Sequence, residues 1–271
     1  MNLRVLIASQ MLKLGAFFQC LLVAVLRPSD MSEWARARYD RQSGEWNLHN
    51  NPDQGLSEDE QVLWERVPAR AGRILILGGG GGREAIFFAR QGLQVTAFDL
   101  SDGMLAQARA MMQARGLAIE TTRGDLAAFD APAHSCDAVW TSMFLYSVVL
   151  GRARRLAILE RIRRTLAPGG WLVVSFHLDP DARLGARGDR LRRLIARLTC
   201  GNAGYQNGDA LFGTLEFRHC FESEAEARAE FAASGFDVAF STAFAGLMRG
   251  GAVLVKKSEW PGVSTPSRSA C

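Results

Sequence analysis

Five consecutive glycines, Gly78 to Gly82, and the carboxylate of Asp99 are the residues of this sequence best suited to bind a ligand. Glycine permits a positive φ in a sharp turn, and it lacks the Cβ that would keep a ligand away from the backbone. A carboxylate at the end of the following strand can accept hydrogen bonds from the hydroxyl groups of a ribose. Together they predict a site for a nucleotide-like molecule, held between a glycine turn and an acid.

The spacing of the glycines narrows the class of ligand. The dinucleotide pattern G-x-G-x-x-G needs a glycine at Arg83 or at Glu84, and it fails at both positions. The pattern G-x-G-x-G, at Gly78, Gly80 and Gly82, is intact. A flexible loop would also be rich in glycine, but this run lies between an apolar strand and an apolar helix, which favours a binding turn.

Such a turn must be positioned by a strand before it and a helix after it. Residues Ile74 to Leu77 predict a short buried strand, and the run from Glu84 to Arg90 predicts the helix. Further strands are predicted at 94–99, 118–121, 137–141, 172–176, 236–240 and 252–256, and further helices at 57–67, 103–115, 152–166 and 224–233. Strands that alternate with helices predict an α/β fold with a doubly wound, mostly parallel sheet.

Composition indicates a globular protein with one sizeable domain and additions, or at most two domains. The chain has 271 residues, 48% of them hydrophobic, and a net charge of +4. Arginines are dense at 152–164 and 183–197. Such runs are typical of helix faces in solvent, or of surfaces that bind an acidic substrate or an anionic membrane. Five scattered cysteines without a C-x-x-C pair predict reduced thiols in a cytoplasmic protein.

Four segments surround or interrupt the predicted domain at 71–257. Residues 1–30 form an apolar extension, which is either a membrane-surface helix or a segment that precedes a true start at Met31. The aromatic residues between 31 and 70 predict a helical lid. An arginine-rich insertion occupies 178–221, and residues 258–271 are predicted to be a disordered tail.

Five pieces of the sequence, at 74–82, 95–101, 124–126, 137–139 and 166–170, share their order and spacing with a known family. They resemble the class I, Rossmann-like S-adenosylmethionine-dependent methyltransferases, over about residues 60–177. The resemblance implies a seven-stranded sheet whose last strand is antiparallel, with S-adenosyl-L-methionine as the cofactor. It also implies that the insertion at 178–221 caps the substrate, with four polar residues as candidate contacts: Arg183, Arg187, Tyr205 and His219.

The resemblance further implies a set of cofactor contacts. The expected residues are Gly78, Gly79 and Gly80 at the methionine part, Asp99 at the ribose, Leu100 and Met104 beside the adenine, Asp125 and Leu126 at its edge, and Met143 on the methyl side. One position departs from the family, which often has an acidic residue where this chain has Ile76. Glu84 is the candidate to replace that carboxylate.

Methyl transfer from a sulfonium is an in-line displacement, so the protein must align the reacting atoms and exclude water. A hydroxyl or ammonium acceptor must also lose a proton, and a base is expected at the carboxyl ends of the strands. The candidates are His177, after the fifth strand, and Tyr146, after the fourth; a structural role for His177 is the alternative. Tyr39 and His49 of the lid are weaker candidates, and no metal site is expected.

The sequence therefore predicts methyl transfer to an oxygen or nitrogen atom of a small-molecule acceptor, without nucleic acid and with contact to a membrane surface only through residues 1–30. Two other classes remain open. A non-catalytic protein that binds the cofactor is suggested by Ile76 and by the lack of an evident base. A nicotinamide-dependent oxidoreductase would share the glycine turn and Asp99, but the failed dinucleotide pattern argues against it.

Overall fold

The computed structural model describes residues 3–49, 51, 53–68, 72–212, 216–244, 246 and 248–257; the predicted tail at 258–271 lies outside them. The helices are α1 (Leu3–Val25), α2 (Pro28–His49), α3 (Glu58–Trp64), α4 (Arg83–Arg90), α5 (Asp102–Gln113), α6 (Leu145–Val148), α7 (Arg152–Thr165), α8 (Ala186–Leu198) and α9 (Glu224–Ala233). The strands are β1 (Arg73–Leu77), β2 (Gln94–Asp99), β3 (Glu120–Arg123), β4 (Cys136–Thr141), β5 (Leu166–Leu178), β6 (Asp209–Phe212), β7 (Glu216–Phe221), β8 (Phe236–Ala243) and β9 (Arg249–Lys256).

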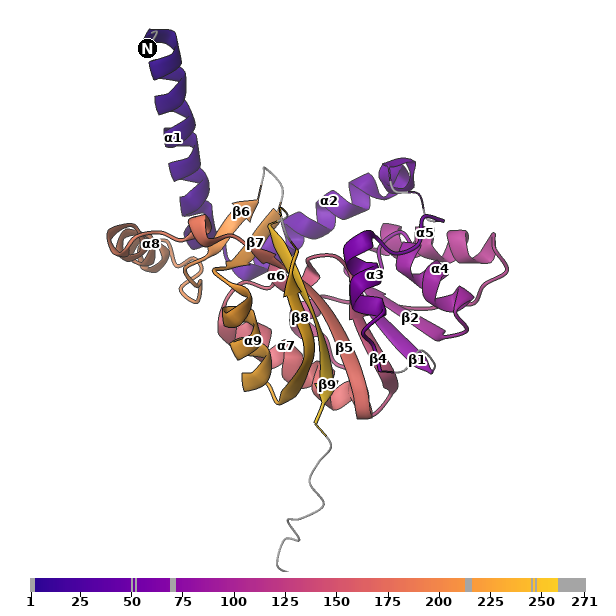
Figure 1. Cartoon of the computed structure of the whole chain (residues 1–271). Coiled ribbons are helices and arrows are strands. Elements are labelled where there is room, and N and C mark those ends of the chain that lie inside the picture. Colours follow the sequence, from indigo (N-terminus) through magenta and orange to yellow (C-terminus); the bar gives the residue numbers. More distant parts are fainter. Residues whose placement is uncertain are drawn as a thin grey trace, which may run out of the picture.

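The sheet has the predicted doubly wound topology. Strands β3, β2, β1, β4 and β5 lie side by side in that order and are parallel to one another. Strand β9 is antiparallel to both β5 and β8. These seven strands form the expected arrangement with an antiparallel last strand, and the prediction of fold class is confirmed (Figure 1). Strands β6 and β7 of the insertion extend the sheet to nine strands, because β7 pairs in parallel with the end of β5 and antiparallel with β6.

Strand β5 is longer than predicted. The strand was predicted at 172–176, but Leu166 already pairs with Cys136 of β4. The register then shifts before Trp171 pairs with Ala138, and Gly169 in between takes a φ of 73°. The chain therefore makes its turn as a bulge within the strand, where glycine adopts the left-handed backbone conformation without strain.

Two apolar layers pack on opposite faces of the sheet because successive strand residues point to opposite sides. In β1, Ile74 and Ile76 face the layer under α3, α4 and α5, whereas Leu75 and Leu77 face the layer under α7 and α9. The first layer is rich in aromatic contacts, such as the edge-to-face packing of Phe88 on Trp140 with ring centroids 5.0 Å apart. This three-layer arrangement holds the carboxyl ends of the strands in fixed positions.

The N-terminal helices and the insertion lie at the carboxyl edge of the sheet. Helix α2 crosses above this edge from the β6–β7 hairpin toward α5, and α1 projects away from the body beside α8 (Figure 1). Because α2 begins at Pro28, the predicted boundary between residues 30 and 31 falls inside this helix. Val23 and Ala24, before that boundary, are buried against Leu150 and Phe217. The contacts favour treating the end of α1 as part of the fold.

Candidate functional site

The glycine turn is braced on the end of β2. The backbone N–H groups of Gly78 and Gly79 both donate to the carbonyl oxygen of Phe98, at 2.8 and 3.2 Å. Gly78 and Gly80 have positive φ angles of 75° and 47°. A Cβ added to Gly79 would lie 2.6 Å from the Cβ of Ala97, so no side chain fits at that position. Gly82 has a φ of 92° as well. The turn therefore requires glycine for its bend at three positions and for close packing at a fourth.

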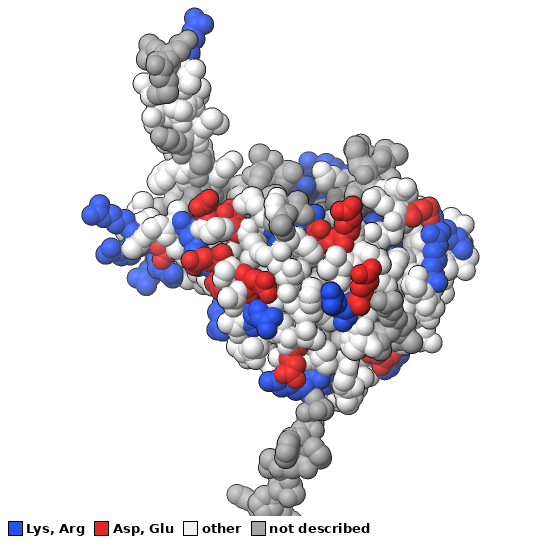
Figure 2. Space-filling view, viewed as in Figure 1, with Lys and Arg blue, Asp and Glu red and all other residues white. Residues whose placement is uncertain are grey.

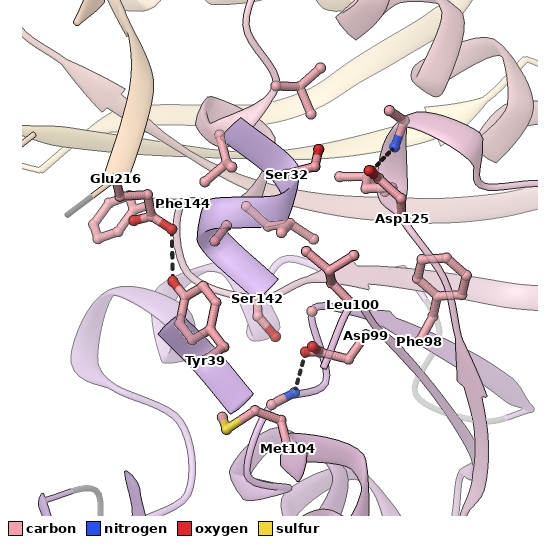
Figure 3. A pocket seen from close by; sticks show the side chains of 18 of the residues that line it. Ser32, Tyr39, Phe98, Asp99, Leu100, Met104, Asp125, Ser142, Phe144 and Glu216 are labelled. Carbon is pink, nitrogen blue, oxygen red and sulfur yellow. Dashed lines mark hydrogen bonds between the residues drawn. The ribbon is translucent and has the colours of Figure 1, made fainter. Parts of the chain in front are cut away.

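Asp99 closes this turn from the other side. One carboxylate oxygen accepts a hydrogen bond from the backbone N–H of Gly80 at 2.9 Å (Figure 3). The other accepts one from the backbone N–H of Ser101 at 2.9 Å. Burial raises the pKa of Asp99 above its ordinary value, although these N–H donors act in the opposite direction. Each oxygen has a second lone pair, so Asp99 can still accept hydrogen bonds from a ligand.

A cavity of about 430 Å³ opens in front of the turn and Asp99. The structure brings eight of the nine predicted cofactor residues to its wall: Gly78, Gly80, Asp99, Leu100, Met104, Asp125, Leu126 and Met143. The ninth, Gly79, does not line the cavity, because it packs against Ala97 beneath the turn. At the adenine end, the carboxylate of Asp125 accepts a hydrogen bond from the backbone of Ala127 at 2.8 Å and thereby fixes the local turn.

The lid and the insertion meet across this cavity. The hydroxyl of Tyr39 on α2 donates to a carboxylate oxygen of Glu216 on β7 at 2.7 Å (Figure 3). Glu216 also forms an ion pair with Arg218, two residues along the same strand. Burial, together with the negative charge of Glu216, raises the pKa of Tyr39, so its hydroxyl stays protonated and acts as a donor. Sequence reasoning missed Glu216 and Arg218, although their alternation with Phe217 and His219 indicates a strand.

The lid is also joined to the cofactor side of the cavity. Asp40 of α2 accepts a hydrogen bond from the hydroxyl of Ser101 at 2.5 Å. The same hydroxyl oxygen caps α5 by accepting from the backbone N–H of Met104 at 3.1 Å. A Cβ on Gly103 would approach the hydroxyl of Ser43 to 2.6 Å, which shows how closely α2 lies on the start of α5. The side chain of His49, the other lid candidate, lies outside the described part of the chain.

Buried charged residues lie next to the glycine turn, although the position where the family often has an acid is occupied by Ile76 in this chain. Ile76 is fully buried in the apolar layer, whereas Glu84 lines the cavity. Glu84 pairs with Arg83 at 2.9 Å, and Arg83 pairs in turn with the buried carboxylate of Glu60 at 2.6 Å. Burial raises the pKa of Glu84 even though Arg83 opposes this shift. The position that fails the dinucleotide pattern, Arg83, thus anchors α3 to the turn.

His177 lies behind the wall of the cavity rather than on it. Its ring stacks on Phe144 with centroids 4.0 Å apart, and Phe144 lines the cavity. The Nδ1 atom of His177 lies 3.0 Å from the carbonyl oxygen of Met248, and its Nε2 atom contacts the guanidinium of Arg218. Because both ring nitrogens are already engaged, this placement does not support the predicted role of His177 as a base.

The buried ring of His177 predicts a dependence of stability on pH. Burial, aided by the charge of Arg218, lowers its pKa from 6.5 to about 4. The unfolded chain therefore binds more protons than the folded chain between these values, and stability is expected to fall as pH decreases through this range. Urea denaturation at neutral pH and at about pH 5 should show a smaller loss for His177→Gln than for the wild type. Equal losses in the two proteins would show that the ring does not titrate as the structure implies.

Tyr146 is placed in the core, away from the cavity wall. It is buried, and its hydroxyl donates to Glu230 on α9 at 2.6 Å. Glu230 forms an ion pair with Arg155 at 2.7 Å. Burial raises the pKa of Tyr146 well above its ordinary value, with the charge of Glu230 as the second cause. This position supports a structural role for Tyr146 rather than the predicted catalytic one.

The polar residues expected to face the substrate from the insertion are likewise directed elsewhere. Arg183 pairs with Glu222 at 3.4 Å, and His219 is fully buried against Asp209 at 2.7 Å. None of the four candidates, Arg183, Arg187, Tyr205 and His219, is among the described residues that line the cavity. Arg154 of α7 lines it instead, beside apolar residues from the start of α2.

Comparison with known proteins agrees with this geometry. A family model described as a methyltransferase domain matches residues 74–170. The tRNA 5-carboxymethoxyuridine methyltransferase of Escherichia coli strain K12 is 32% identical over 125 residues. That match covers 44% of this chain and 48% of the relative, so the chain spans about half the length of the curated relatives it matches.

Solved structures extend the likeness to most of the chain. The complex of DhpI with SAH superposes with a TM-score of 0.58 at 20% identity, over 84% of this chain and 97% of that one. The [4+2]-cyclase SpnF superposes with a TM-score of 0.60 at 17% identity, over 86% of this chain and 98% of that one. At such identities the superpositions establish the fold alone.

The relatives correct one expectation about the acceptor. A small-molecule acceptor without nucleic acid was expected, but both curated relatives, from two Escherichia coli strains, are named for a tRNA nucleoside. The resemblance seen in the sequence is confirmed by the family model and by the fold. Residues 74–170 match a methyltransferase domain, and the fold around them is that of the class I S-adenosylmethionine-dependent methyltransferases.

Proposed function

We propose that this protein binds S-adenosylmethionine and transfers its methyl group to a carboxylate oxygen of an acidic acceptor. The single observation that carries the choice of acceptor is Arg154, a cation on the cavity wall without an acidic partner among the described residues. The cofactor is supported by the methyltransferase domain and by the residues that the fold gathers at the cavity.

The shape of the site fits this cofactor. The glycine turn leaves backbone exposed at Gly78 and Gly80, and Asp99 offers carboxylate oxygens beside it. At the other end, a Cβ on Gly124 would come within 2.5 Å of the ring of Phe98, so this wall is also held close by glycine. Glu84 would lie near the methionine ammonium, as the replacement for the acid missing at Ile76. When bound, S-adenosylmethionine supplies a methyl group already activated on a sulfonium sulfur.

Once Asp99 and Asp125 are assigned to the cofactor, the described part of the cavity wall offers no side chain that is free to remove a proton. The carboxylate of Glu216 already holds Tyr39 and Arg218, and that of Glu84 is paired with Arg83. Tyr39 stays protonated because its pKa is raised. A carboxylate acceptor needs no base, since it is ionised at neutral pH. The absence of a free base on this wall therefore favours a nucleophile that arrives deprotonated.

Arg154 is positioned to hold such an acceptor. It is half-buried, and its guanidinium lies 3.4 Å from the carbonyl oxygen of Leu150, an interaction that leaves donors for an anionic group. The neighbouring wall is apolar, with Met31 and Trp34 from α2 and Phe217 from β7. The acid-bearing nucleoside in the name of the curated relatives has the chemistry that this end of the cavity would accept.

The proposed activity is tested with S-adenosylmethionine that carries a labelled methyl group. The protein is incubated separately with unfractionated tRNA and with an organic-acid extract, and labelled product is followed in each. A carboxyl methyl ester releases its label as methanol in mild base, whereas a methyl group on nitrogen or on a simple hydroxyl is retained. Label that survives base treatment would contradict the carboxylate acceptor. Cofactor binding without transfer to any fraction would favour the non-catalytic alternative.

Substitution of Arg154 separates the acceptor from the cofactor. Arg154→Gln is expected to lower kcat/KM for the acceptor by about tenfold or more, because a charge-assisted hydrogen bond contributes about 1.5–3 kcal/mol. Its affinity for S-adenosylhomocysteine, measured by calorimetry, should stay within twofold of the wild type, about 0.4 kcal/mol. Arg109→Gln, at an exposed arginine that donates to Thr121, is the matched control. An unchanged kcat/KM for Arg154→Gln would remove this residue from the acceptor site.

A further inference from the structure

Helix α1 presents an apolar surface that the rest of the protein does not cover. Its segment Arg4–Val25 has 22 residues; the most apolar 18-residue window within it has a mean hydropathy of 1.6, and none of that window is buried. Eight large apolar side chains are 40% to 75% exposed: Val5, Leu6, Ile7, Met11, Leu12, Leu14, Phe17 and Phe18. A helix that is hydrophobic all round belongs either in a protein core or in lipid, and the exposure of α1 excludes the first.

The length of the helix suits a lipid bilayer. At 1.5 Å per residue, the segment would extend about 33 Å, close to the ~30 Å of a bilayer's hydrocarbon core. Its two charged residues, Arg4 and Lys13, are both basic. Arg4 lies at the end of the segment, where a long basic side chain can extend toward the headgroups. The sequence alone predicted only contact with a membrane surface through residues 1–30. The structure shows that the helix begins at Leu3.

Helix α8 carries a second apolar surface beside α1. Leu191, Leu194 and Leu198 are 43%, 52% and 75% exposed, and their spacing places them on one face of the helix. The opposite face packs into the protein through Arg192 and Ala196, which are buried. A stripe of exposed leucines that faces away from its own protein is an unfavourable arrangement in water.

Arginines accompany this leucine stripe. Arg187, Arg190, Arg193 and Arg197 are all exposed on α8. Figure 2 shows Lys and Arg side chains clustered over α8 and a largely uncharged surface along the described part of α1. A helix with arginines beside a hydrophobic stripe is suited to the interface of a membrane with anionic lipids, where leucines enter the acyl region and arginines meet headgroup phosphates.

The two helices are fixed relative to each other at the base of α1. The carbonyl oxygen of Ala24 accepts a hydrogen bond from the backbone N–H of Asn202 at 2.8 Å, just after α8. The side chain of Arg27 donates to the carbonyl oxygen of Cys200 at 3.2 Å. A Cβ on Gly201 would come within 2.1 Å of the carbonyl oxygen of Ala24, so the two backbone segments are in direct contact at this point. One membrane could therefore engage both apolar surfaces at once.

We propose that α1 inserts into a lipid bilayer and that α8 lies on the same membrane, with its arginines at anionic headgroups. The proposal is independent of the acceptor proposed above, because it rests on surfaces outside the cavity. It assigns α1 the main share of attachment and α8 the preference for anionic lipid.

The test uses the full chain, reconstituted from detergent into vesicles and floated on a density gradient. The vesicles are phosphatidylcholine alone, or equal parts of phosphatidylcholine and phosphatidylglycerol. The wild type is expected to float with both kinds and to resist extraction by alkaline carbonate. Leu12→Glu/Phe18→Glu, which leaves the buried Val23 and Ala24 unchanged, is expected to lose this resistance. A wild type that stays at the bottom of the gradient, or a double variant that floats equally well, would overturn insertion of α1.

The role of α8 is measured in the Leu12→Glu/Phe18→Glu background, where attachment is reversible. Arg190→Gln/Arg197→Gln is expected to lower binding to the anionic vesicles by about tenfold or more, since each arginine near such a surface contributes about 1 kcal/mol. Arg109→Gln is the matched control away from both helices. Equal binding by the α8 variant would refute the assignment of α8, and intact folding is checked by circular dichroism. Mass spectrometry of the protein from cells would overturn the whole proposal if residues before about 30 had been removed as a signal sequence.

Discussion

Replacement of Glu230 by alanine is expected to lower the free energy of unfolding by about 3–5 kcal/mol. Glu230 is 3% exposed and Arg155 is fully buried, and the two form a bidentate pair at 2.7 and 3.0 Å. The hydroxyl of Tyr146 donates to the same carboxylate. Removal of Glu230 would leave the guanidinium of Arg155 without its carboxylate in the core, which is far less favourable than the loss of an exposed pair. Chemical denaturation followed by far-ultraviolet circular dichroism measures the change.

A surface pair provides the control for this prediction. Glu160 pairs with Arg163 on α7 at 2.8 Å, but its side chain is more than half exposed. Glu160→Ala should change stability by less than about 1 kcal/mol. If Glu230→Ala does not fold, Glu230→Gln retains the shape and one acceptor oxygen, and it should still be destabilised more than Glu160→Ala. Equally small losses of unfolding free energy in both variants would mean that water solvates the charge of Arg155 when its carboxylate partner is removed.

Replacement of Asp99 by alanine is expected to weaken binding of S-adenosylmethionine and S-adenosylhomocysteine about tenfold or more, equivalent to about 1.4 kcal/mol. The substitution would remove acceptors for the ribose hydroxyls, and it would also release the N–H of Gly80 that Asp99 holds at 2.9 Å. Both the lost ribose contacts and the loosened glycine turn would therefore weaken cofactor binding. Titration calorimetry with S-adenosylhomocysteine measures the affinity without turnover.

Asp102 is the matched control for Asp99. It lies three residues further along, in the first turn of α5, and its exposed carboxylate pairs with Arg123 at 3.2 Å. Asp102→Ala should leave the dissociation constant unchanged. The assignment of Asp99 to the ribose would be abandoned if Asp99→Ala bound the cofactor as tightly as the wild type. Binding of NADH in place of S-adenosylhomocysteine would instead revive the oxidoreductase alternative.

The gathering of the proposed cofactor residues at one cavity could be predicted from the sequence, because it depends on local backbone geometry. Gly78 and Gly80 sit directly after β1, and Asp99 ends β2, so a parallel pairing of two short strands is enough to bring them together. Asp125 and Met143 follow the ends of β3 and β4 for the same reason. Only Gly79 differs from expectation, since it packs under the turn instead of facing the cavity.

The acceptor half could not be predicted, because it depends on contacts between distant parts of the chain. His177 does follow the expected strand, but Phe144 adopts a φ of 63° and stacks between its ring and the cavity. Nothing in the sequence indicates that a phenylalanine takes that rare conformation. Tyr146 faces the core because Arg155 and Glu230 provide a buried partner there, 84 residues away for the carboxylate. Arg154, one position before Arg155, is the residue left to face the cavity.

The hydrogen bond between Tyr39 and Glu216 affects how the cavity can open. It joins α2 to β7 across the space, while Asp40 ties the same helix to Ser101 on the cofactor side. The lid is thus held by hydrogen bonds on two sides of the cavity. Because a hydrogen bond to an ionised carboxylate is stronger than one between neutral groups, any movement of α2 away from β7 would have to offset the loss of this bond.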